Sequence, residues 1–478
     1  MIDELHTPVA KAEEQPVGLA DRVSREYLVH HQVCPTTLLP DGSLAVAVTD
    51  ESLLDSLDDL GIAYGRSVVA RPVSSQDLDM LIARLTSTEE DTVELSKDEG
   101  DQDRFTSDIR DLVNQPPVVR YVSLLIREAY EAGASDIHLE STRAGLQARF
   151  RVDGALLPGI DPPGRLDRAV VSRVKLLADL DIAERRRPQD GRLRVRLKER
   201  ELDLRVSTVP TIYGESVVLR LLERSGPAIA LESLGLSAEL LVTMQGIARK
   251  PHGMILVTGP TGSGKTTTLY AALGLRDATA EKIITLEDPV EYALAGVTQV
   301  PIHTQTGVTF ASMLRSVLRQ DPDVVLVGEM RDTETAELAV QAALTGHVVF
   351  ATLHTNDAVG AIPRLLNLGV PPYLISATLE AVLAQRLVRR ICEGCREPSA
   401  KGRGCPACRG TGYRGRTGLF ELLLVTDEIR EAIVAEPSRS RIEALARANG
   451  MLPLRVDGSA KVEGGVTTTE EVLRVTQE

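Results

Sequence analysis

The chain has 478 residues, 43% of them hydrophobic, which is too long for one ordinary core and predicts several domains. Its formal net charge of -14, with no Trp and 3% aromatic residues, weighs against a protein that stacks on single-stranded nucleic acid. No stretch approaches the roughly 20 apolar residues that span a bilayer, and Met1–Val17 has no apolar signal-peptide segment, so we expect a cytoplasmic protein.

Residues 1–88 predict a small α/β module at the N-terminus. Short apolar runs alternate there with helical patterns; the runs lie at 27–29, 43–49 and 67–70, and the helices at 51–60 and 75–85. Cys34 stands alone in an apolar context and is expected to be a core residue. Residues 89–115 follow as an acidic linker, because eight Asp or Glu and one Lys between Glu89 and Asp103 cannot build a core.

Three further regions are predicted downstream. Residues 116–228 combine a helical pattern at 118–132 with strands at 137–139, 146–152, 193–209 and 217–222, which indicates an α+β domain. From 229 to 390 each strand is followed by a helix, a pattern typical of a parallel sheet with crossover connections. Residues 391–424 hold four cysteines, and residues 425–478 read as mostly helical.

The strongest motif is a phosphate-binding loop. An apolar strand at 254–258 precedes Gly259-Pro-Thr-Gly-Ser-Gly-Lys-Thr266, and a helical pattern at 267–275 follows. Glycines allow successive backbone N–H groups to point at phosphates, Lys265 neutralises the β- and γ-phosphates, and the Thr266 hydroxyl can bind Mg²⁺. The predicted nucleotide-binding residues are Gly259, Pro260, Thr261, Gly262, Ser263, Gly264, Lys265, Thr266 and Thr267.

A second motif places an acid near this loop. The buried-strand pattern Asp323-Val-Val-Leu-Val-Gly-Glu329 ends in a carboxylate that could polarise the attacking water or hold the Mg²⁺ shell together with Thr266. Gly328 stands where an aspartate at the strand end would be expected. Glu329 therefore serves both duties, or other acids assist it.

Two further segments carry a specific resemblance. Ile283–Tyr292 resembles the aspartate box of secretion ATPases, and Thr345–Asp357 resembles their histidine box. The similarity continues through three other segments, namely Gly133–Glu140, Arg149–Gly154 and Gly412–Glu421. Over residues 116–425 the chain is thus similar to the ATPases of type II secretion and type IV pilus assembly. Its N-terminal module of about 85 residues makes it most like the type II secretion motor.

The resemblance implies roles for matching residues. It implies that Glu287, Asp288 and Glu291 face the metal or the attacking water. It implies that His347 and His354 sense the γ-phosphate and relay its presence to a neighbouring subunit. Each histidine alone could equally be a core or turn residue whose hydrogen bonds are made within the protein.

Arginines form a second implied group. Arg205 and Arg220 match family positions that reach the nucleotide from the domain before the motor. Arg315 and Arg319 lie four residues apart, so they share one helix face. Guanidinium groups suit phosphate binding because their planar fork stays charged, although most arginines in such a chain are simply solvated.

The four cysteines predict a metal site. Cys392, Cys395, Cys405 and Cys408 form two C-x-x-C pairs separated by nine residues. Four thiolates without an open position describe structural Zn²⁺, whereas a redox site would need only one pair. The nine-residue spacer is shorter than in many relatives, and related pilus retraction motors generally lack such a cluster.

The combined expectation is a RecA-like ATPase core, preceded by an α+β domain and an N-terminal α/β module and carrying a zinc knuckle. The resemblance implies a homo-hexamer that uses ATP and Mg²⁺ to drive fibre assembly and protein export. It also implies binding to inner-membrane platform proteins through residues 1–103, so that membrane association is indirect. Rival interpretations are a pilus assembly ATPase, a nucleic-acid translocase, for which the composition gives no support, and a non-hydrolysing scaffold.

Overall fold

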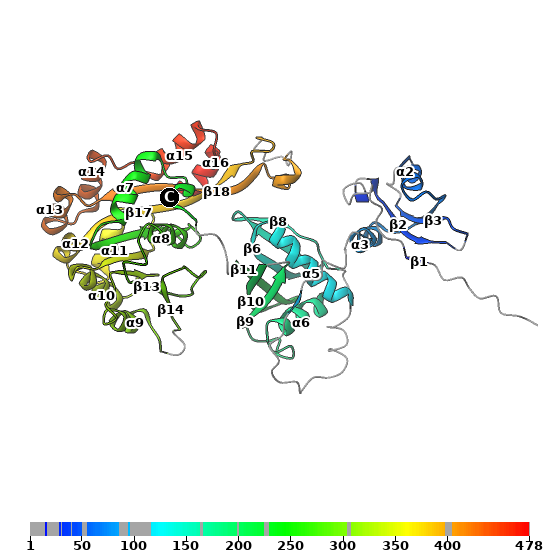
Figure 1. The fold of residues 1–478 in the computed structure, drawn as a ribbon, viewed down its shortest axis with the longest axis horizontal. Helices are drawn as coiled ribbons and strands as arrows, with labels where there is room; N and C mark the ends of the chain where they lie inside the picture. The colour runs from blue at the N-terminus through cyan, green and yellow to red at the C-terminus, as the bar shows by residue number, and fades with distance from the viewer. Residues whose placement is uncertain are drawn as a thin grey trace, which may run out of the picture. The chain divides into compact units, whose positions relative to one another are not determined.

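The computed structural model describes residues 15–16, 28–29, 31–39, 41–49, 55–85, 94–95, 116–162, 166–197, 200–223, 229–303, 307–396 and 404–477. The chain divides into two compact units, residues 1–94 and 95–478. Figure 1 draws the elements of each.

The first unit is a four-stranded sheet with helices packed against it. The strand order is β1-β2-β3-β4, with β1 and β2 antiparallel, β2 and β3 antiparallel, and β3 and β4 parallel. The elements are β1 (Gln15–Pro16), β2 (Val33–Leu38), β3 (Leu44–Val48), α2 (Asp55–Tyr64), β4 (Val68–Pro72) and α3 (Ser75–Leu85). The predicted helix at 75–85 is confirmed, as is the small α/β character of this unit.

Two details of this unit differ from expectation. Leu28 and Val29 are helical, and the strand that follows them, β2, was not predicted. Pro35 breaks the alternation of β2 because the pairing with β3 shifts register between Pro35 and Thr37. Cys34 is buried in the core as expected, and burial raises the pKa of its thiol to about 12. Most of the predicted acidic linker lies outside the described residues.

An antiparallel sheet with two helices forms the middle of the chain. Its strand order is β5-β9-β10-β11-β6-β7-β8. The elements are β5 (Glu94–Leu95), α5 (Pro116–Glu131), β6 (Ala134–Thr142), β7 (Gly145–Val152), β8 (Ala155–Pro158), α6 (Asp167–Leu177), β9 (Gln189–Leu197), β10 (Arg200–Thr211) and β11 (Gly214–Glu223). The predicted α+β character is confirmed, whereas α6 was not predicted. Its buried Lys175 is neutralised by Glu215 at 2.8 Å.

A second seven-stranded sheet has the order β14-β13-β15-β16-β12-β17-β18. Every pair is parallel except β17 with β18. The strands are β12 (Gly253–Thr258), β13 (Ile283–Glu287), β14 (Thr298–Pro301), β15 (Val324–Val327), β16 (Val348–Leu353), β17 (Leu379–Ile391) and β18 (Tyr413–Leu424). The expected parallel sheet with crossovers is therefore confirmed, and the antiparallel edge strand β18 is an addition.

Helices cover both faces of this sheet (Figure 1). Side chains along each strand alternate between two cores: Leu256 packs with α9 to α13, and its neighbour Val257 packs with α7 and α8. The helices are η2 (Leu231–Leu234), α7 (Ala238–Ala248), α8 (Lys265–Leu273), α9 (Phe310–Val317), α10 (Thr333–Leu344), α11 (Ala361–Asn367), α12 (Pro372–Thr378) and α13 (Asp427–Ala435). Both faces of the central strands are thereby buried, which explains their continuous apolar sequences.

The C-terminal part is helical, as predicted. It consists of α13, α14 (Arg439–Ala448), α15 (Leu454–Glu463) and α16 (Thr469–Thr476). Helices α15 and α16 pack against β17 and β18. The short helix η4 (Pro406–Cys408) lies between these two strands in sequence.

Candidate active site

The phosphate-binding loop joins β12 to α8 at the carboxyl end of the parallel sheet. All six residues of β12 are buried, and α8 begins at Lys265, directly after Gly264. Gly259 has a φ of +149°, and a Cβ there would lie 2.5 Å from the carbonyl oxygen of Gln385 on β17. The loop can curl so tightly against β17 only because this residue has no side chain.

Lys265 turns back onto its own loop. Its Nζ donates to the carbonyl oxygens of Gly259 at 2.8 Å and Pro260 at 3.0 Å. Burial lowers the pKa of Lys265, the carboxylate of Glu329 raises it, and the charge of Arg386 lowers it. The ammonium, the loop N–H groups and the half-buried hydroxyls of Thr266 and Thr267 form a donor set that fits a nucleotide polyphosphate with Mg²⁺.

Two buried side chains brace the start of α8. Thr268 donates its hydroxyl hydrogen to Oε1 of Gln385 at 2.6 Å. The buried hydroxyl of Ser263 has no hydrogen-bond partner within the described part of the chain. Such a polar atom at a phosphate-binding loop fits a site that receives its partner from a ligand.

Glu329 lies at the same edge of the sheet, two residues after β15. The adjoining segment is tied to β16, because Thr352 donates to the Gly328 carbonyl at 2.5 Å and Met330 donates to the Thr352 carbonyl at 3.1 Å. A Cβ at Gly328 would lie 2.9 Å from the Leu286 carbonyl oxygen. Steric crowding by β13 therefore explains why no aspartate occupies this strand end.

The carboxylate of Glu329 has two neighbours. Oε1 lies 2.6 Å from a guanidinium nitrogen of Arg331, and Oε2 lies 3.6 Å from Nε2 of His354. Arg331 was not singled out from the sequence, although its place two residues after the acid was a usable signal. The structure thus brings Glu329 and His354 together on the loops that follow β15 and β16.

His347 lies elsewhere. It precedes β16, and its carbonyl oxygen accepts from the N–H of Gly253 at the start of β12. Its Nδ1 hydrogen-bonds to the Ala342 carbonyl at 2.9 Å. Because β16 has six residues, His347 is about 20 Å along the strand from the edge that holds the phosphate loop. The structure does not bring His347 to the phosphate loop of its own chain.

Glu287 ends β13 but is buried in a hydrogen-bond network. Its carboxylate accepts from the hydroxyl of Tyr270, from Thr285 at 2.5 Å and from the Gln299 amide at 3.1 Å. Tyr292 packs edge-on against Tyr270, with ring centroids 4.8 Å apart. Three side-chain donors hold this carboxylate inside the protein, whereas Asp288, the next residue, is exposed. Of the three acids predicted in this segment, Glu287 alone is buried, whereas Asp288 and Glu291 are exposed.

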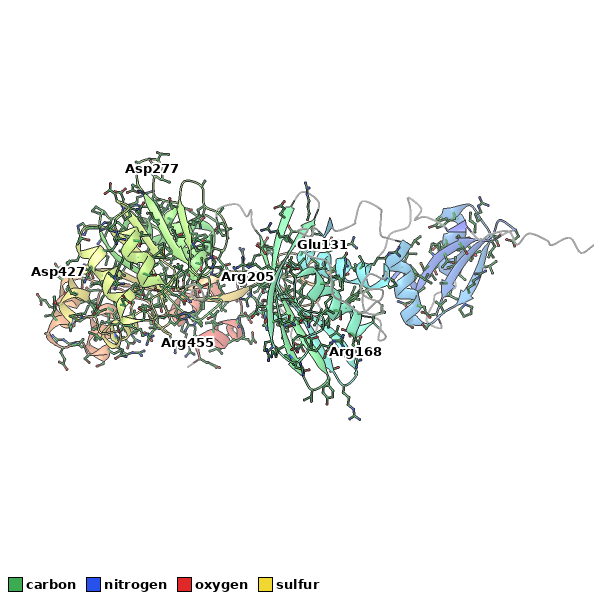
Figure 2. All side chains as sticks on the ribbon, turned by 90° about the horizontal axis from the view of Figure 1, so that it is seen from below. Glu131, Arg168, Arg205, Asp277, Asp427 and Arg455 are labelled. Atoms are coloured by element: carbon green, nitrogen blue, oxygen red, sulfur yellow. The ribbon has the colours of Figure 1, made fainter. Side chains whose placement is uncertain are left out.

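The arginines fall into two groups. Arg205 projects from β10 (Figure 2), and Arg220 on β11 donates through Nε to Asp136 at 2.9 Å. Desolvation raises the pKa of Glu291, while the charges of Arg205 and Arg220 act in the opposite direction.

Arg315 lies in the last turn of α9, whereas Arg319 lies two residues beyond the end of this helix, which is shorter than the prediction of a shared helix face requires. Arg315 pairs with Glu334, and Arg319 donates to the Arg315 carbonyl oxygen at 2.8 Å. Arg315 is half exposed, at 53% of its side chain. No described contact joins this pair to the phosphate loop of the same chain.

The four cysteines of the predicted knuckle converge at the end of the β17–β18 hairpin. Their Sγ atoms all lie within 4.8 Å of one another, as expected for a four-thiolate site. The N–H of Gly412 donates to Sγ of Cys408 at 3.2 Å, a backbone contact that stabilises a thiolate. The four thiol groups and this backbone donor fit Zn²⁺, which would be held by all four cysteines.

Comparison with protein families shows to which family the chain belongs. Residues 111–474 match the family model described as type II/IV secretion system protein. The chain belongs to this family. Residues 6–92 match a separate model, the MshEN domain. The family assignment confirms the resemblance found in the sequence, and together with the phosphate loop it makes the chain an ATPase.

Curated relatives match over most of their length. Type II secretion system protein HxcR of Pseudomonas aeruginosa is 47% identical, covering 85% of this chain and 89% of the relative. Type II secretion system protein E of Dickeya dadantii is 44% identical over 92% of this chain and 95% of the relative. Type II secretion system ATPase E of Vibrio cholerae is 46% identical over 78% of each.

Solved structures agree with the fold. The pilus retraction motor PilT with bound ADP is 27% identical, with a TM-score of 0.54, and covers 74% of this chain and 96% of that structure. The ATPase DotB of Legionella pneumophila has a TM-score of 0.59 at 21% identity, covering 79% and 97%, and supports the fold alone. The predicted RecA-like motor of this family is therefore confirmed. In the described part of the chain, no helix has both the length and the apolar character needed to cross a bilayer.

Proposed function

We propose that this chain is the motor ATPase of a type II secretion system, which hydrolyses ATP to drive assembly of a pilus-like fibre and export of proteins. The observation that carries this proposal is the match to relatives named type II secretion system protein E, at 42–50% identity over most of the chain. The four clustered cysteines support the same assignment. Pilus assembly is the runner-up, since a pilus motor shares the fold.

The proposed chemistry follows from the geometry of the site. The loop N–H groups and Lys265 bind the β- and γ-phosphates, and Thr266 with Glu329 holds Mg²⁺, which spreads the charge of the phosphate oxygens. Glu329 orients the attacking water and accepts its proton as the bond to the leaving ADP breaks. His354, beside Glu329, senses the γ-phosphate.

Other residues complete this site in the proposal. Arg205 and Arg220 approach the nucleotide from the α+β domain, near Glu291. Glu287 supports β13 and Tyr270 from within the core, and does not touch the attacking water. Six copies form a ring, in which Arg315, Arg319 and His347 face a neighbouring subunit and not the nucleotide of their own chain.

The remaining parts connect the motor to its machine. We propose that residues 1–103 bind an inner-membrane platform protein, so that this cytoplasmic chain associates with the membrane indirectly. The cysteine knuckle holds Zn²⁺ as a structural ion. Nucleic acid is not a partner in this proposal, so DNA should not stimulate hydrolysis.

The test is complementation in the native host. A strain that lacks the gene should fail to export its extracellular enzymes, and the wild-type chain should restore export. Lys265→Ala should not restore it, because the phosphates lose their ammonium partner. Glu337→Gln, on an exposed part of α10, is the matched control and should restore export. Loss of pili with intact enzyme export would assign the motor to pilus assembly.

ATP turnover separates the remaining rivals. The purified chain should hydrolyse ATP with Mg²⁺, and Lys265→Ala should be inactive. Equal turnover of the two would support a non-hydrolysing scaffold, and strong stimulation by DNA would support a translocase. Co-purification of a membrane protein with the full chain, and its loss on deletion of residues 1–103, would support the platform contact.

A further inference from the structure

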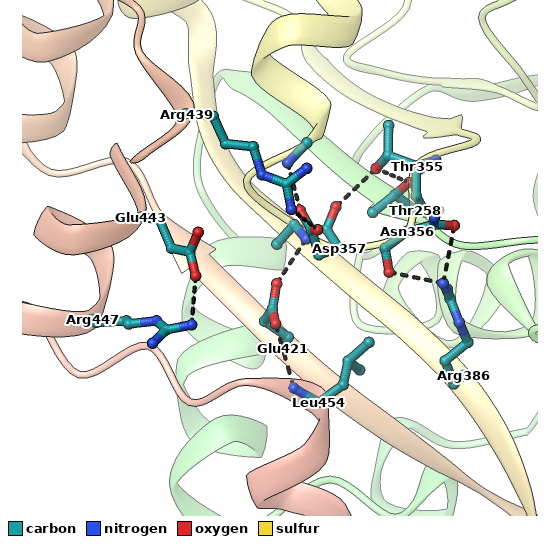
Figure 3. A network of polar contacts seen from close by, with 12 residues as sticks. Thr258, Thr355, Asn356, Asp357, Arg386, Glu421, Arg439, Glu443, Arg447 and Leu454 are labelled. Atoms are coloured by element: carbon teal, nitrogen blue, oxygen red, sulfur yellow. Dashed lines mark hydrogen bonds and ion pairs between the residues drawn. The ribbon is translucent and has the colours of Figure 1, made fainter. Parts of the chain in front are cut away.

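A chain of polar contacts runs from the phosphate-loop strand to the C-terminal helices (Figure 3). Its centre is the segment 355–358, called the post-β16 loop below, which directly follows His354. The residues that contact it come from β12, β17, β18 and α14. These elements are distant in sequence, so the loop is held by tertiary contacts and not by its own secondary structure.

The first contact joins the loop to β12. The Thr258 hydroxyl, which is fully buried, accepts from the N–H of Thr355 at 2.9 Å and lies 2.7 Å from the Thr355 hydroxyl. Thr258 is the residue immediately before Gly259. The position of the post-β16 loop is therefore coupled directly to the start of the phosphate loop.

The second contact is made by Asp357. One carboxylate oxygen accepts from the N–H of Gly360 at 2.7 Å, and the other pairs with the guanidinium of Arg439 at 2.5 Å. Arg439 is the first residue of α14. This ion pair ties the loop to a C-terminal helix from its solvent side, because the Asp357 side chain is 20% exposed and that of Arg439 54% exposed.

The third contact is made by Glu421 on β18. Its carboxylate is buried and bridges two segments: Oε1 accepts from the N–H of Ala358 at 2.8 Å, and Oε2 from the N–H of Leu454 at 3.3 Å. Leu454 begins α15. A buried acid with both oxygens bound to backbone N–H groups fixes those groups in place, since losing either acceptor leaves a buried donor unpaired.

Charge balance supports this arrangement. Arg386 on β17 donates to the Asn356 carbonyl oxygen at 2.8 Å, and its charge interacts with both Asp357 and Glu421. Two acids thus face two arginines around one four-residue loop. If the Asp357–Arg439 pair served only to cap α14 at the surface, the buried acid Glu421 and the second arginine, Arg386 on β17, would not be needed.

We propose that Glu421 and the Asp357–Arg439 pair are positioning residues for ATP hydrolysis, which hold the post-β16 loop so that His354 stays beside Glu329. They touch neither nucleotide nor water, and act through His354. The inference rests on the proposed role of His354 at the γ-phosphate. It also makes α14 and α15 part of the hydrolysis machinery and not only a structural cover.

The test compares steady-state ATP hydrolysis of Arg439→Gln with the wild-type chain. The loop should lose its fixed position, and kcat should fall by about tenfold while KM for ATP changes by less than about twofold. Arg439→Lys keeps the positive charge and should recover most of the activity. Arg441→Gln on the same helix, with a side chain 53% exposed, is the matched control and should retain wild-type kcat.

A second variant tests whether a loss of activity comes from positioning or only from unfolding. Glu421→Gln preserves size but offers an amide NH₂ to one of the two backbone donors, so it should also lower kcat. Thermal melting of each variant separates positioning from unfolding. A fall in kcat that appears only where the protein is already unfolded at the assay temperature would overturn the inference.

The decisive measurement combines Arg439→Gln with His354→Gln. If Arg439 acts through His354, the double variant should have the kcat of His354→Gln alone. Multiplicative losses would overturn the inference while leaving the role of His354 intact. A His354→Gln variant with wild-type kcat would instead remove the proposed role of His354, and this inference with it.

Discussion

Nε2 of His354 lies 3.6 Å from Oε2 of Glu329, and the two side chains reach this position from loops that follow neighbouring parallel strands. The other carboxylate oxygen of Glu329 lies 2.6 Å from the Arg331 guanidinium. One acid is thus shared between a histidine and an arginine at the edge of the sheet where β12 meets the phosphate loop. Of the two histidines of the histidine box, His354 therefore lies beside Glu329 and His347 at the opposite end of β16.

The first prediction concerns these histidines. Glu329→Gln should lower kcat for ATP hydrolysis by about a hundredfold or more, and His354→Gln by about tenfold, because in the proposed mechanism Glu329 accepts the proton of the attacking water and His354 senses the γ-phosphate. His347→Gln should keep kcat within about threefold in the dilute, unassembled chain, because its side chain binds the Ala342 carbonyl at the opposite edge. Equal losses for both histidine variants would contradict this division.

The second prediction concerns Tyr270. Tyr270→Phe removes one of the two hydroxyl groups that donate to the buried carboxylate of Glu287, which should lower the free energy of unfolding by about 1–3 kcal/mol. Urea unfolding followed by circular dichroism measures the loss. Tyr373→Phe is the matched control, because that side chain is 62% exposed. If Tyr270→Phe is as stable as the wild-type chain, the Glu287 carboxylate does not need the hydrogen bond from the Tyr270 hydroxyl.

The third prediction concerns the knuckle. Purified protein should contain about one zinc ion per chain, and its removal by a chelator should lower the melting temperature. Cys405→Ser should lose the metal, since three thiolates bind it more weakly. Cys34→Ser should retain it, because Cys34 lies in the core of the first unit. Full zinc content in Cys405→Ser would contradict the four-thiolate site.

The fourth prediction concerns acid stability. Glu471 on α16 is bound by Arg474 and Arg389, and these partners lower its pKa from 4.5 to about 2 against the opposing effect of burial. Because the folded-state pKa is depressed, this stabilisation is fully present above about pH 4.5 and is lost as the pH falls toward 2.

Glu471→Gln should remove up to about 3 kcal/mol at neutral pH and flatten the decline of stability between pH 4.5 and 2. The exposed neighbour Glu470, changed to Gln, should leave that slope as in the wild-type chain. The free energy of unfolding of both variants, measured across this pH range, tests the prediction. Parallel curves for wild type and Glu471→Gln would show that the carboxylate does not drive the acid response.

The features that were predictable from sequence depend on local pattern. The apolar strand, the glycines and Lys265 stand within 13 residues, so both the loop and its place at a strand end could be predicted. The two C-x-x-C pairs were equally local. The burial of Glu287 could not be predicted in this way, because Tyr270 and Gln299 lie 17 and 12 residues away and meet it only through packing.

Two other features were visible in the sequence but were not used. His347 and His354 flank one strand of six residues, five of them apolar, and residues at the two ends of a strand lie at opposite edges of a parallel sheet. Gln385 and Arg386 interrupt an apolar run between Leu383 and Val388, and the charge of Arg386 there needs a partner. The partners of Arg386 depend on the tertiary fold, so the sequence indicated the residue but not its contact.

Strand β17 has a consequence beyond packing. Its residue Ala384 pairs with Thr258 beside the phosphate loop, and the same strand continues to Ile391, next to Cys392 of the knuckle. Eight residues separate Ala384 from Cys392, a reach of about 26 Å in extended backbone. One hydrogen-bonded strand therefore joins the phosphate loop to the cysteine cluster. A change of about three degrees in the direction of β17 at Gln385 would displace Cys392 by about an ångström, so a small rearrangement beside the phosphate loop would also move the cysteine cluster.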